Sequence, residues 1–463
     1  MYVSSISKTN KLADTPIPKL IVTLSIPSIV SMLVTNIYNL VDTAFVGQLG
    51  TSASGAVGIV FGFMSIIQAF GFMFGQGAGS IISRSLGKND KEKADINATA
   101  GFFGSFFFGM LITAVGFIFL DDIVMLLGST ETIFPYAKTY ISYILIASPF
   151  MSSSLTLNNI LRYEGKANLG MIGLMTGAIL NMIGDPIFMF GLNMGISGAG
   201  LSTALSQLVG WVILLMMFIL KKSSSSISFK NLKKADVMVY LNIMTTGFPS
   251  LLRQALNSLT TVMLNSQCAV YGDAAVAGMS IVSRIVFFAF SIALGVGQGF
   301  QPVSAYNYGA GKYDRVRKGF RFTCLVSEGI IIVGCTLLFI FASQLVGLFR
   351  DDIDVINVGT RALRLQSIAY LALPPCMTTE MLYQSTGRRI GAAILTALRS
   401  GLLFIPALII LANLRGLAGI QEALPISLIL SAPLTVIFAI YFFKKLPKNN
   451  QLPPVQPEEE NDE

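Results

Sequence analysis

The sequence predicts an all-α protein of twelve membrane-spanning helices, grouped in two similar lobes of six. Of the 463 residues, 53% are hydrophobic and only 12% are charged, whereas soluble domains carry about 25% charged residues. Apolar segments of about 20 residues, the length that crosses a bilayer as a helix, recur along nearly the whole chain. In addition, the second half of the chain repeats features of the first half at a constant spacing.

The apolar segments set the bounds of the expected helices, because short loops rich in Gly, Lys, Asp and Asn separate them. The twelve predicted spans cover residues 18–46, 52–78, 95–120, 135–161, 166–191, 195–220, 237–268, 274–304, 318–345, 357–385, 389–413 and 418–443.

Basic residues gather in alternate loops. Most of the 32 Lys and Arg residues fall on the side of the N-terminus, whereas loops on the other side hold only Arg350 and Arg415, beside an acidic excess. Because basic loops stay in the cytoplasm, we expect a multi-pass protein of the cell membrane with both termini cytoplasmic. The formal charge of +8 follows from these loops and gives no reason to expect a nucleic-acid partner; the expected partner is the lipid bilayer.

The spans and loops divide the chain into five parts. Residues 1–17 form a cytoplasmic segment, residues 18–220 the N-lobe and residues 237–446 the C-lobe. The intervening residues 221–236 read KKSSSSISFKNLKKAD, which predicts a flexible, polar linker. Residues 447–463 are rich in Pro and Glu, and we expect a disordered tail.

The two lobes repeat when the chain is shifted by 222 residues. Pro27 then falls on Pro249, the Gly75–Gly77 segment on Gly297–Gly299, and Gly165 on Gly387. An even number of spans per half gives a parallel repeat, whose pseudo-two-fold axis runs along the membrane normal. Two such lobes around a central cavity are typical of alternating-access transporters.

The stretch ILNMIGDPIFMF (179–190) places a carboxylate inside an apolar span. Asp185 is costly at membrane depth, and such residues usually have a function. Pro186 removes a backbone donor and leaves a carbonyl near Asn181 without its helical partner. The carboxylate, the carboxamide and the freed carbonyl predict an oxygen-rich site for a proton or a hard cation.

Three further spans bring polar groups to the same predicted depth. The resulting candidate site for the coupling ion and the substrate consists of Tyr38, Asn39, Asp42, Tyr140, Asn181, Asp185, Thr203 and Gln207. Two neighbouring carboxylates in a low dielectric repel each other, which favours binding of a proton or a cation between them. A Na⁺ ion would be held at Asp42, Asn181, Asp185 and Thr203.

The composition excludes several other chemistries. The sequence has no histidine, which rules out His-ligated zinc, and its four cysteines form no CxxC pair. We therefore expect no enzymatic activity and no cofactor other than the coupling ion. The glycine-rich segments at 75–79 and 295–299 follow no predicted strand, so we interpret them as close helix packing rather than phosphate loops.

The C-lobe does not repeat the acidic site, because Asp42 falls on Leu264 after the shift. Its membrane charges include Arg253, Arg399, Glu328 and Glu380. We expect both glutamates to pair with basic residues rather than to bind the coupling ion.

The motifs resemble those of the multidrug and toxic compound extrusion (MATE) family, in particular its DinF-type branch. The residues that carry the resemblance are Pro27, Ser28, Asn39 and Asp42 in the first span, Gly75, Gly77, Ile82, Ser83 and Arg84 in the second, Asn181, Asp185 and Pro186 in the fifth, and Gly198, Ala199 and Thr203 in the sixth. The resemblance implies a V-shaped cavity between the lobes and export of amphipathic, often cationic, compounds in exchange for H⁺ or Na⁺. It also implies the N-lobe site residues Tyr38, Asp42, Tyr140, Asn181, Asp185 and Thr203, and we expect a monomer.

Two alternatives remain open at this stage. A lipid-linked oligosaccharide flippase shares the architecture, but a flippase for pyrophosphate lipids would line its cavity with Arg or Lys, whereas the N-lobe carries Asp. An intramembrane enzyme is disfavoured because the only adjacent Asp pairs, at 121–122 and 351–352, lie in predicted outer loops.

Overall fold

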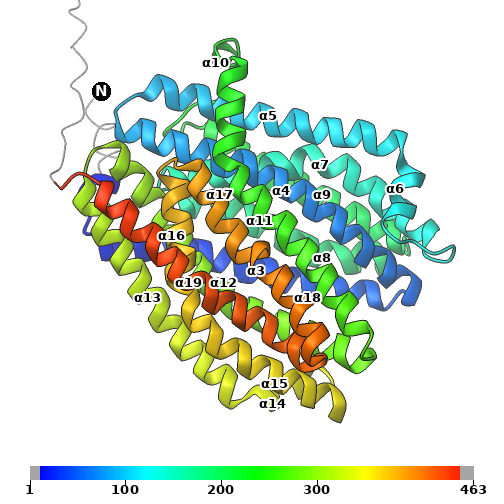
Figure 1. Cartoon of the computed structure of the whole chain (residues 1–463). Coiled ribbons are helices and arrows are strands. Elements are labelled where there is room, and N and C mark those ends of the chain that lie inside the picture. The colour runs from blue at the N-terminus through cyan, green and yellow to red at the C-terminus, as the bar shows by residue number, and fades with distance from the viewer. Residues whose placement is uncertain (1–10, 449–463) are drawn as a thin grey trace, which may run out of the picture.

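The computed structural model describes residues 11–448, and every element within that range is a helix (Figure 1). The elements are α2 (Lys11–Asp14), α3 (Ile17–Gly47), α4 (Thr51–Gly87), α5 (Lys91–Ile118), α6 (Leu120–Leu126), α7 (Phe134–Tyr163), α8 (Ala167–Pro186), η1 (Ile187–Gly191), α9 (Ile196–Ile219), α10 (Phe229–Leu232), α11 (Val237–Ala269), α12 (Asp273–Gly309), α13 (Tyr313–Ile340), α14 (Ala342–Phe349), α15 (Ile353–Ala369), η2 (Tyr370–Ala372), α16 (Leu373–Ser385), α17 (Arg389–Ala397), η3 (Leu398–Leu402), α18 (Phe404–Arg415) and α19 (Leu417–Lys445).

The predicted spans correspond to these helices. Within the described residues, ten helical stretches are long and apolar enough to cross a membrane. The remaining two predicted spans are the 33-residue α11 and the continuous segment α15–η2–α16, which pack among them. Two helices run further than predicted: α4 continues to Gly87 and α12 to Gly309. These extra turns contain polar residues such as Ser83, Ser85 and Asn307, which are buried where the lobes meet.

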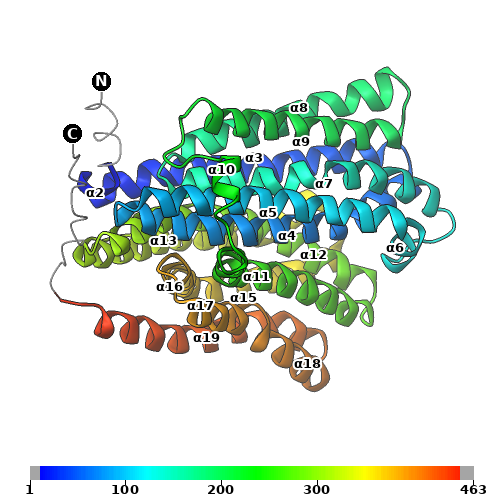
Figure 2. The same cartoon turned by 90° about the horizontal axis from the view of Figure 1, so that it is seen from above.

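Two lobes lie side by side when the bundle is viewed from above (Figure 2). The N-lobe, α3–α9, has α8 and α9 at its outer side, and the C-lobe, α11–α19, has α18 and α19 at the opposite side. We call the end of the bundle at which α4, α7 and α12 finish the basic end, because it carries Lys88, Lys166 and Lys312.

The hydrophobic core explains why the lobes form a V. At the basic end one core contains residues of both lobes, among them Met73 and Ile82 from α4 and Val303 from α12. Toward the other end the core is divided, with one cluster built from N-lobe residues and another from C-lobe residues. The lobes are therefore joined at the basic end and separate toward the other end.

Glycines allow the lobes to meet closely, as the sequence analysis predicted for the glycine-rich segments. A Cβ on Gly77 would lie 2.1 Å from the carbonyl oxygen of Ile243, and a Cβ on Gly299 would lie 2.2 Å from Oγ of Ser25. A Cβ on Gly77 would also lie 3.1 Å from the amide nitrogen of Gly247, and the 222-residue shift relates this contact to that of Gly299, because Gly77 corresponds to Gly299 and Ser25 to Gly247. Close helix packing is thus the role of these glycines.

Hydrogen bonds between the lobes reinforce this closure. Ser80 on α4 donates to the carbonyl oxygens of Gln384 and Ser385, at 3.0 and 3.1 Å, and Arg84 donates to that of Ser385 at 2.8 Å. Among the described residues, the hydrogen bonds and glycine contacts that join the lobes lie between mid-helix and the basic end.

The segment 221–236 differs from the flexible linker that its composition predicts. The carboxylate of Glu164, whose side chain is fully buried, accepts hydrogen bonds from the Ser225 amide at 2.9 Å and from the hydroxyls of Ser223 and Ser225. Asp95 accepts from the Ser226 amide at 2.7 Å. The sequence assigns these serines to a mobile linker, but their donors bind the buried Glu164 and the partly exposed Asp95, so this part of the segment is held against the N-lobe.

Both described ends of the chain lie at the basic end, where arginines of α13 hold them. Arg315 donates to the carbonyl oxygens of Leu12 and Thr15, and Arg317 donates to those of Leu446 and Pro447. The expectations for residues 1–10 and 449–463 concern positions outside the described residues.

Candidate functional site

The candidate site begins where α8 loses its regular geometry. Asp185 is completely buried and precedes Pro186, the last residue of α8. The five residues that follow form a π-helix, η1. A proline and a π-helical turn both displace backbone hydrogen bonds, and such irregular turns are frequent at functional sites.

Asn181 lies one turn before Asp185 and connects α8 to α9. Its Nδ2 is 3.2 Å from Oδ1 of Asp185 and 3.3 Å from Oγ1 of Thr203. The hydroxyl of Ser202 donates to the backbone carbonyl of Asn181 at 3.2 Å. This carbonyl is next to that of Met182, which Pro186 leaves without its helical donor, so Ser202 ties α9 to the turn that the proline disrupts.

Asp42, on α3, faces Asp185 from the neighbouring helix. The two carboxyl groups are close enough for a side-chain hydrogen bond, which requires a proton on one of them. Neither residue takes part in an ion pair within residues 11–448. Two acidic groups thus neighbour each other without a compensating basic side chain.

Three oxygen atoms of this cluster have no hydrogen-bond donor. They are Oδ1 of Asp42, Oδ2 of Asp185 and Oδ1 of Asn181, and all three are buried. An unsatisfied buried acceptor costs about 1–3 kcal/mol, and more when it is charged. A proton or an oxygen-preferring cation bound here would satisfy these acceptors and neutralise the paired charges.

The other predicted residues divide into two groups. Tyr140 is 1% exposed and lies within hydrogen-bonding range of the Thr203 side chain, so it belongs to the buried cluster. Tyr38, Asn39 and Gln207 are only partly buried and line the central cavity. The structure therefore brings the eight predicted residues to one region, with the carboxylates behind the cavity wall.

The central cavity has a volume of about 330 Å³ and is lined by both lobes. Its N-lobe wall combines apolar residues such as Met32 and Phe72 with carboxamides such as Gln68 and Asn158. Phe287 and Phe290 contribute an aromatic surface on the C-lobe side. A wall of mixed apolar and polar groups suits an amphipathic ligand.

The charged residues that line this cavity are arginines. Of the residues in positions 11–448, Arg162, Arg253 and Arg399 line it, whereas neither Asp42 nor Asp185 does. The sequence argument against a flippase assumed that the N-lobe aspartates define the polarity of the cavity. That assumption is wrong, because the aspartates are set back behind Tyr38, Asn39 and Asn181.

The C-lobe glutamates have different surroundings. Glu380 is 1% exposed and binds Arg399 at 2.9 Å and Arg253 at 3.1 Å, which confirms its predicted pairing with basic residues. Glu328 forms no ion pair within the described part of the chain, so the prediction is wrong for this residue. Glu328 lies on α13, away from the arginines of α11 and η3.

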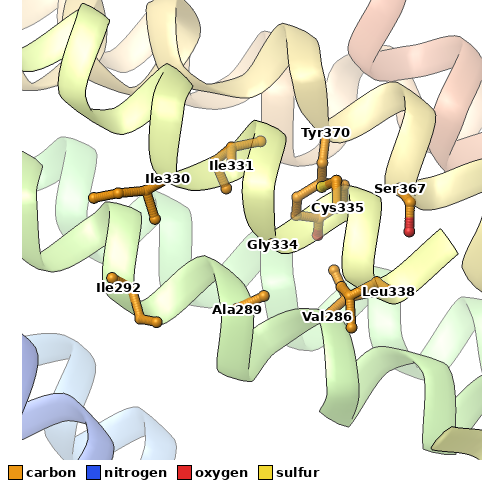
Figure 3. Close-up of a pocket in the computed structure, with 10 residues that line it drawn as sticks. All are labelled: Val286, Ala289, Ile292, Ile330, Ile331, Gly334, Cys335, Leu338, Ser367 and Tyr370. Atoms are coloured by element: carbon orange, nitrogen blue, oxygen red, sulfur yellow. The ribbon is translucent and has the colours of Figure 1, made fainter. Parts of the chain in front are cut away.

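A second, smaller pocket lies within the C-lobe between α12, α13 and α15 (Figure 3). Its volume is about 50 Å³, and its lining includes Val286, Ile331 and Leu338, with Cys335 and Tyr370. No charged side chain lines it, so it offers no chemistry for an ion or a charged group.

Sequence reasoning missed Ser202, Arg253 and Arg399 as contributors. Ser202 directly precedes the predicted Thr203, but a serine in an apolar span is too common to be singled out. The two arginines come from α11 and η3, and their convergence on Glu380 depends on how these helices pack. The available signal was that Arg253, Arg399 and Glu380 all fall inside predicted spans.

Comparison with known proteins gives consistent results for sequence and structure. The family model MatE matches residues 27–187 and 249–410. The two matched segments begin at the same 222-residue offset as the internal repeat. Multidrug export protein MepA of Staphylococcus aureus (strain MSSA476) is 29% identical over 431 residues, covering 93% of this chain and 94% of that protein. The protein of the same name from Staphylococcus haemolyticus (strain JCSC1435) is 29% identical over 405 residues, covering 87% and 89%.

Two solved structures have the same fold along almost the entire chain. One is an outward-facing conformation of a multidrug resistance MATE family transporter of the MOP superfamily, with a TM-score of 0.90 and 26% identity. The other is a MOP superfamily transporter from Pyrococcus furiosus described as having a binding pocket of reverse polarity, with a TM-score of 0.89 and 26% identity. Each comparison covers 95% of this chain and 99% of the other.

Proposed function

This chain belongs to the MatE family of membrane transporters, and we propose that it exports amphipathic organic compounds, cationic ones included, by antiport against H⁺ or Na⁺. The observation that carries the proposal is the Asp42–Asp185 pair: Asp185 is buried and Asp42 half-buried, neither has a basic partner among the described residues, and each has a buried carboxylate oxygen without a hydrogen-bond donor. The names of the MepA relatives and of the MATE structures support drug efflux as the kind of transport. A transporter of this kind is not an enzyme and needs no cofactor beyond its coupling ion.

The distribution of charge supports an orientation in the membrane. The basic end carries the loops rich in Lys and Arg, and such loops remain cytoplasmic. The protein would then lie in the cell membrane with both termini inside. The lobes are closed at the basic end, so the cavity faces the outside in this conformation.

Coupling requires that ion and substrate favour different conformations. Tyr38 and Asn39 line the cavity one turn before Asp42 on α3, so an ion that repositions Asp42 also moves part of the cavity wall. Binding of H⁺ or Na⁺ at Asp42 and Asp185 removes the repulsion between the carboxylates and allows α3 and α8 to pack more closely. Substrate release to the outside follows from this rearrangement of the wall.

The proposed substrate site is the central cavity rather than the acidic cluster itself. Phe72, Phe287 and Phe290 offer surfaces for flat apolar rings, and the Tyr38 ring can receive a cationic group. We further propose that the protein works as a monomer, because the cavity is formed by the two lobes of one chain.

A flippase remains the second candidate, and the arginines that line the cavity favour it. The two functions differ in their dependence on an ion gradient, since the acidic cluster is needed for antiport but has no evident role in flipping a lipid.

The test is ethidium efflux measured in inverted vesicles that contain the protein. An imposed pH gradient is compared with an imposed Na⁺ gradient, and vesicles with the Asp42→Asn variant serve as the control. The proposal predicts ethidium transport driven by one of the two gradients and lost in the variant. Transport that is independent of both gradients, or equal in wild type and variant, would refute it.

A further inference from the structure

The C-lobe wall of the central cavity carries a positive charge that has no role in the proposed ion site of the N-lobe. Arg253 and Arg399 both bind Glu380, so two guanidinium groups share one carboxylate. The Glu380 side chain is 2% exposed, whereas the two arginine side chains are 16% and 14% exposed and line the cavity. The surplus positive charge is therefore presented to the cavity, and the carboxylate is held behind it.

Arg162 adds a third guanidinium to the same cavity. It is 4% exposed, and its hydrogen bonds go to neutral acceptors: the carbonyl oxygen of Gln298 at 3.1 Å, Oε1 of Gln301 at 2.7 Å and Oδ1 of Asn159 at 2.5 Å. The charges of Arg162 and Arg253 are near enough to repel each other. A buried positive charge without an anionic partner is costly, and an anionic ligand would remove that cost.

No acidic side chain of the described residues lines the cavity, so a ligand anion would meet no repulsion at its wall. Neutral donors lie on the same helices as the arginines. Gln254 and Asn257 flank Arg253 on α11, and both line the cavity. Guanidinium groups with nearby carboxamides form a common binding arrangement for carboxylates.

The helix geometry around Arg399 supports a functional position. Arg399 lies in η3, a five-residue π-helical segment between α17 and α18. The N-lobe also has a π-helical segment, η1, directly after Asp185, although it ends its helix, whereas η3 lies between α17 and α18. Each lobe therefore places a charged group at an irregular turn, an acid in the N-lobe and an arginine in the C-lobe, and π-helical turns are often retained where a side chain serves function.

We propose that Arg253 and Arg399, with Arg162 below them, form a subsite for an anionic group of the transported compound, with carboxylate as its chemical class. Compounds with an apolar ring system, a cationic part and a carboxylate would bind to both lobes at once. The same compounds with the carboxylate blocked would lose the C-lobe contact. The inference rests on the proposed function only in taking the central cavity as the place where substrate binds.

The test uses a matched pair of dyes, tetramethylrhodamine and its methyl ester, which differ only in whether the carboxylate is free. Binding of each dye to the purified full-length protein is measured by fluorescence anisotropy at neutral pH. The subsite predicts that the wild type binds the free acid at least about tenfold more tightly than the ester, the effect expected for a charge-assisted hydrogen bond.

Variants with opposite expected effects separate this role from a structural one. Arg253→Gln leaves Glu380 paired with Arg399 through two hydrogen bonds, so the fold is retained and the acid-to-ester affinity ratio should fall to about one. Arg253→Lys keeps the charge and should retain most of the ratio. Glu380→Gln adds net positive charge to the wall and should raise the ratio. Arg361→Gln, at an exposed ion pair with Glu422, is the control and should leave it unchanged.

A wild-type ratio near or below one would overturn the proposal, as would a ratio that neither Arg253→Gln nor Glu380→Gln alters. Equilibrium binding needs no ion gradient, so this outcome is independent of the efflux assay. Failure of gradient-driven efflux would refute antiport, but the acid-to-ester affinity ratio could still be measured and would still test the anion subsite.

Discussion

Among the glycines at which the lobes meet, Gly247 on α11 makes one of the closest contacts. A Cβ at Gly247 would lie 1.8 Å from the carbonyl oxygen of Met73 on α4. To reach even 3.0 Å, the two helices would have to separate by about 1.2 Å. The neighbouring atoms are backbone and cannot rotate away, so we predict that Gly247→Ala opens the basic end.

The size of the effect follows from the cost of overpacking. Forcing an extra methyl group into a packed contact costs about 1–3 kcal/mol, which shifts a two-state equilibrium by roughly 5- to 150-fold. Because Gly247 contacts the other lobe, this cost falls on the closed conformation of the basic end and not on the separated one. The conformation in which the cavity opens at the basic end should therefore gain population.

Spin labels at Thr51 and Asp273 report on this change. The two exposed positions lie at the starts of α4 and α12, away from the basic end, and are related by the 222-residue shift. With the native cysteines replaced by alanine, double electron–electron resonance should give a shorter distance between the labels in Gly247→Ala than in the parent protein.

Ser25 provides the control, because it occupies the equivalent position in the N-lobe. Its own Cβ is already accommodated against α12, so Ser25→Ala should leave the distance distribution unchanged. If Gly247→Ala gives the parent distribution, or if Ser25→Ala shifts it equally, the assignment of the tight contact to α4 and α11 is wrong.

Three further predictions follow from the site and from the linker. Asp42→Asn should abolish export while membrane insertion and thermal stability are kept, because the amide retains the shape and removes a charge that repels Asp185; efflux and a melting curve check this. Leu264→Met should keep at least about half of the wild-type efflux, since a swap of similar volume usually costs under 1.5 kcal/mol; an inactive but folded variant would contradict it. Glu164→Gln should speed tryptic cleavage after Lys222 by about tenfold or more, because the Ser223 and Ser225 donors lose a charged acceptor; gel analysis of the cleavage time course measures this.

Length and hydropathy were sufficient to predict the helices, because each span must satisfy its backbone hydrogen bonds internally within the bilayer. The last turns of α4 and α12 escaped this criterion. These turns contain several polar residues that are buried against the other lobe. A hydropathy window along one helix does not detect burial of this kind.

Part of the candidate site was also predictable. Helical spacing placed Tyr38 and Asn39 on the face of Asp42, and alternation of the spans brought Asp42 and Asp185 to one depth. The partners of Glu164 and Glu380 were harder to predict. Glu164 binds serines about 60 positions away. For Glu380 the sequence predicted pairing with basic residues but not that the partners are Arg253 and Arg399. Such pairings depend on tertiary packing, for which local periodicity carries no information.

The largest difference between the sequence-based expectation and the structure concerns where the aspartates lie relative to the cavity. The sequence indicates which helices carry Asp42 and Asp185 but not which face of the bundle wall they occupy. In the structure Asn181 and Tyr38 separate them from the cavity, while Arg253 and Arg399 line it. In this arrangement the proposed ion site is adjacent to the proposed substrate site but distinct from it.

The central claim is that Asp42 and Asp185 hold the coupling ion in exchange with substrate. Its most direct test is ion release from purified protein when substrate is added, with protons followed by a pH-sensitive dye and Na⁺ by displacement of bound radioactive sodium. The account predicts that saturating ethidium releases one of these ions from the wild type, and that Asp42→Asn and Asp185→Asn release none while still binding ethidium. Release of the same amount of ion by both variants as by the wild type would contradict the account.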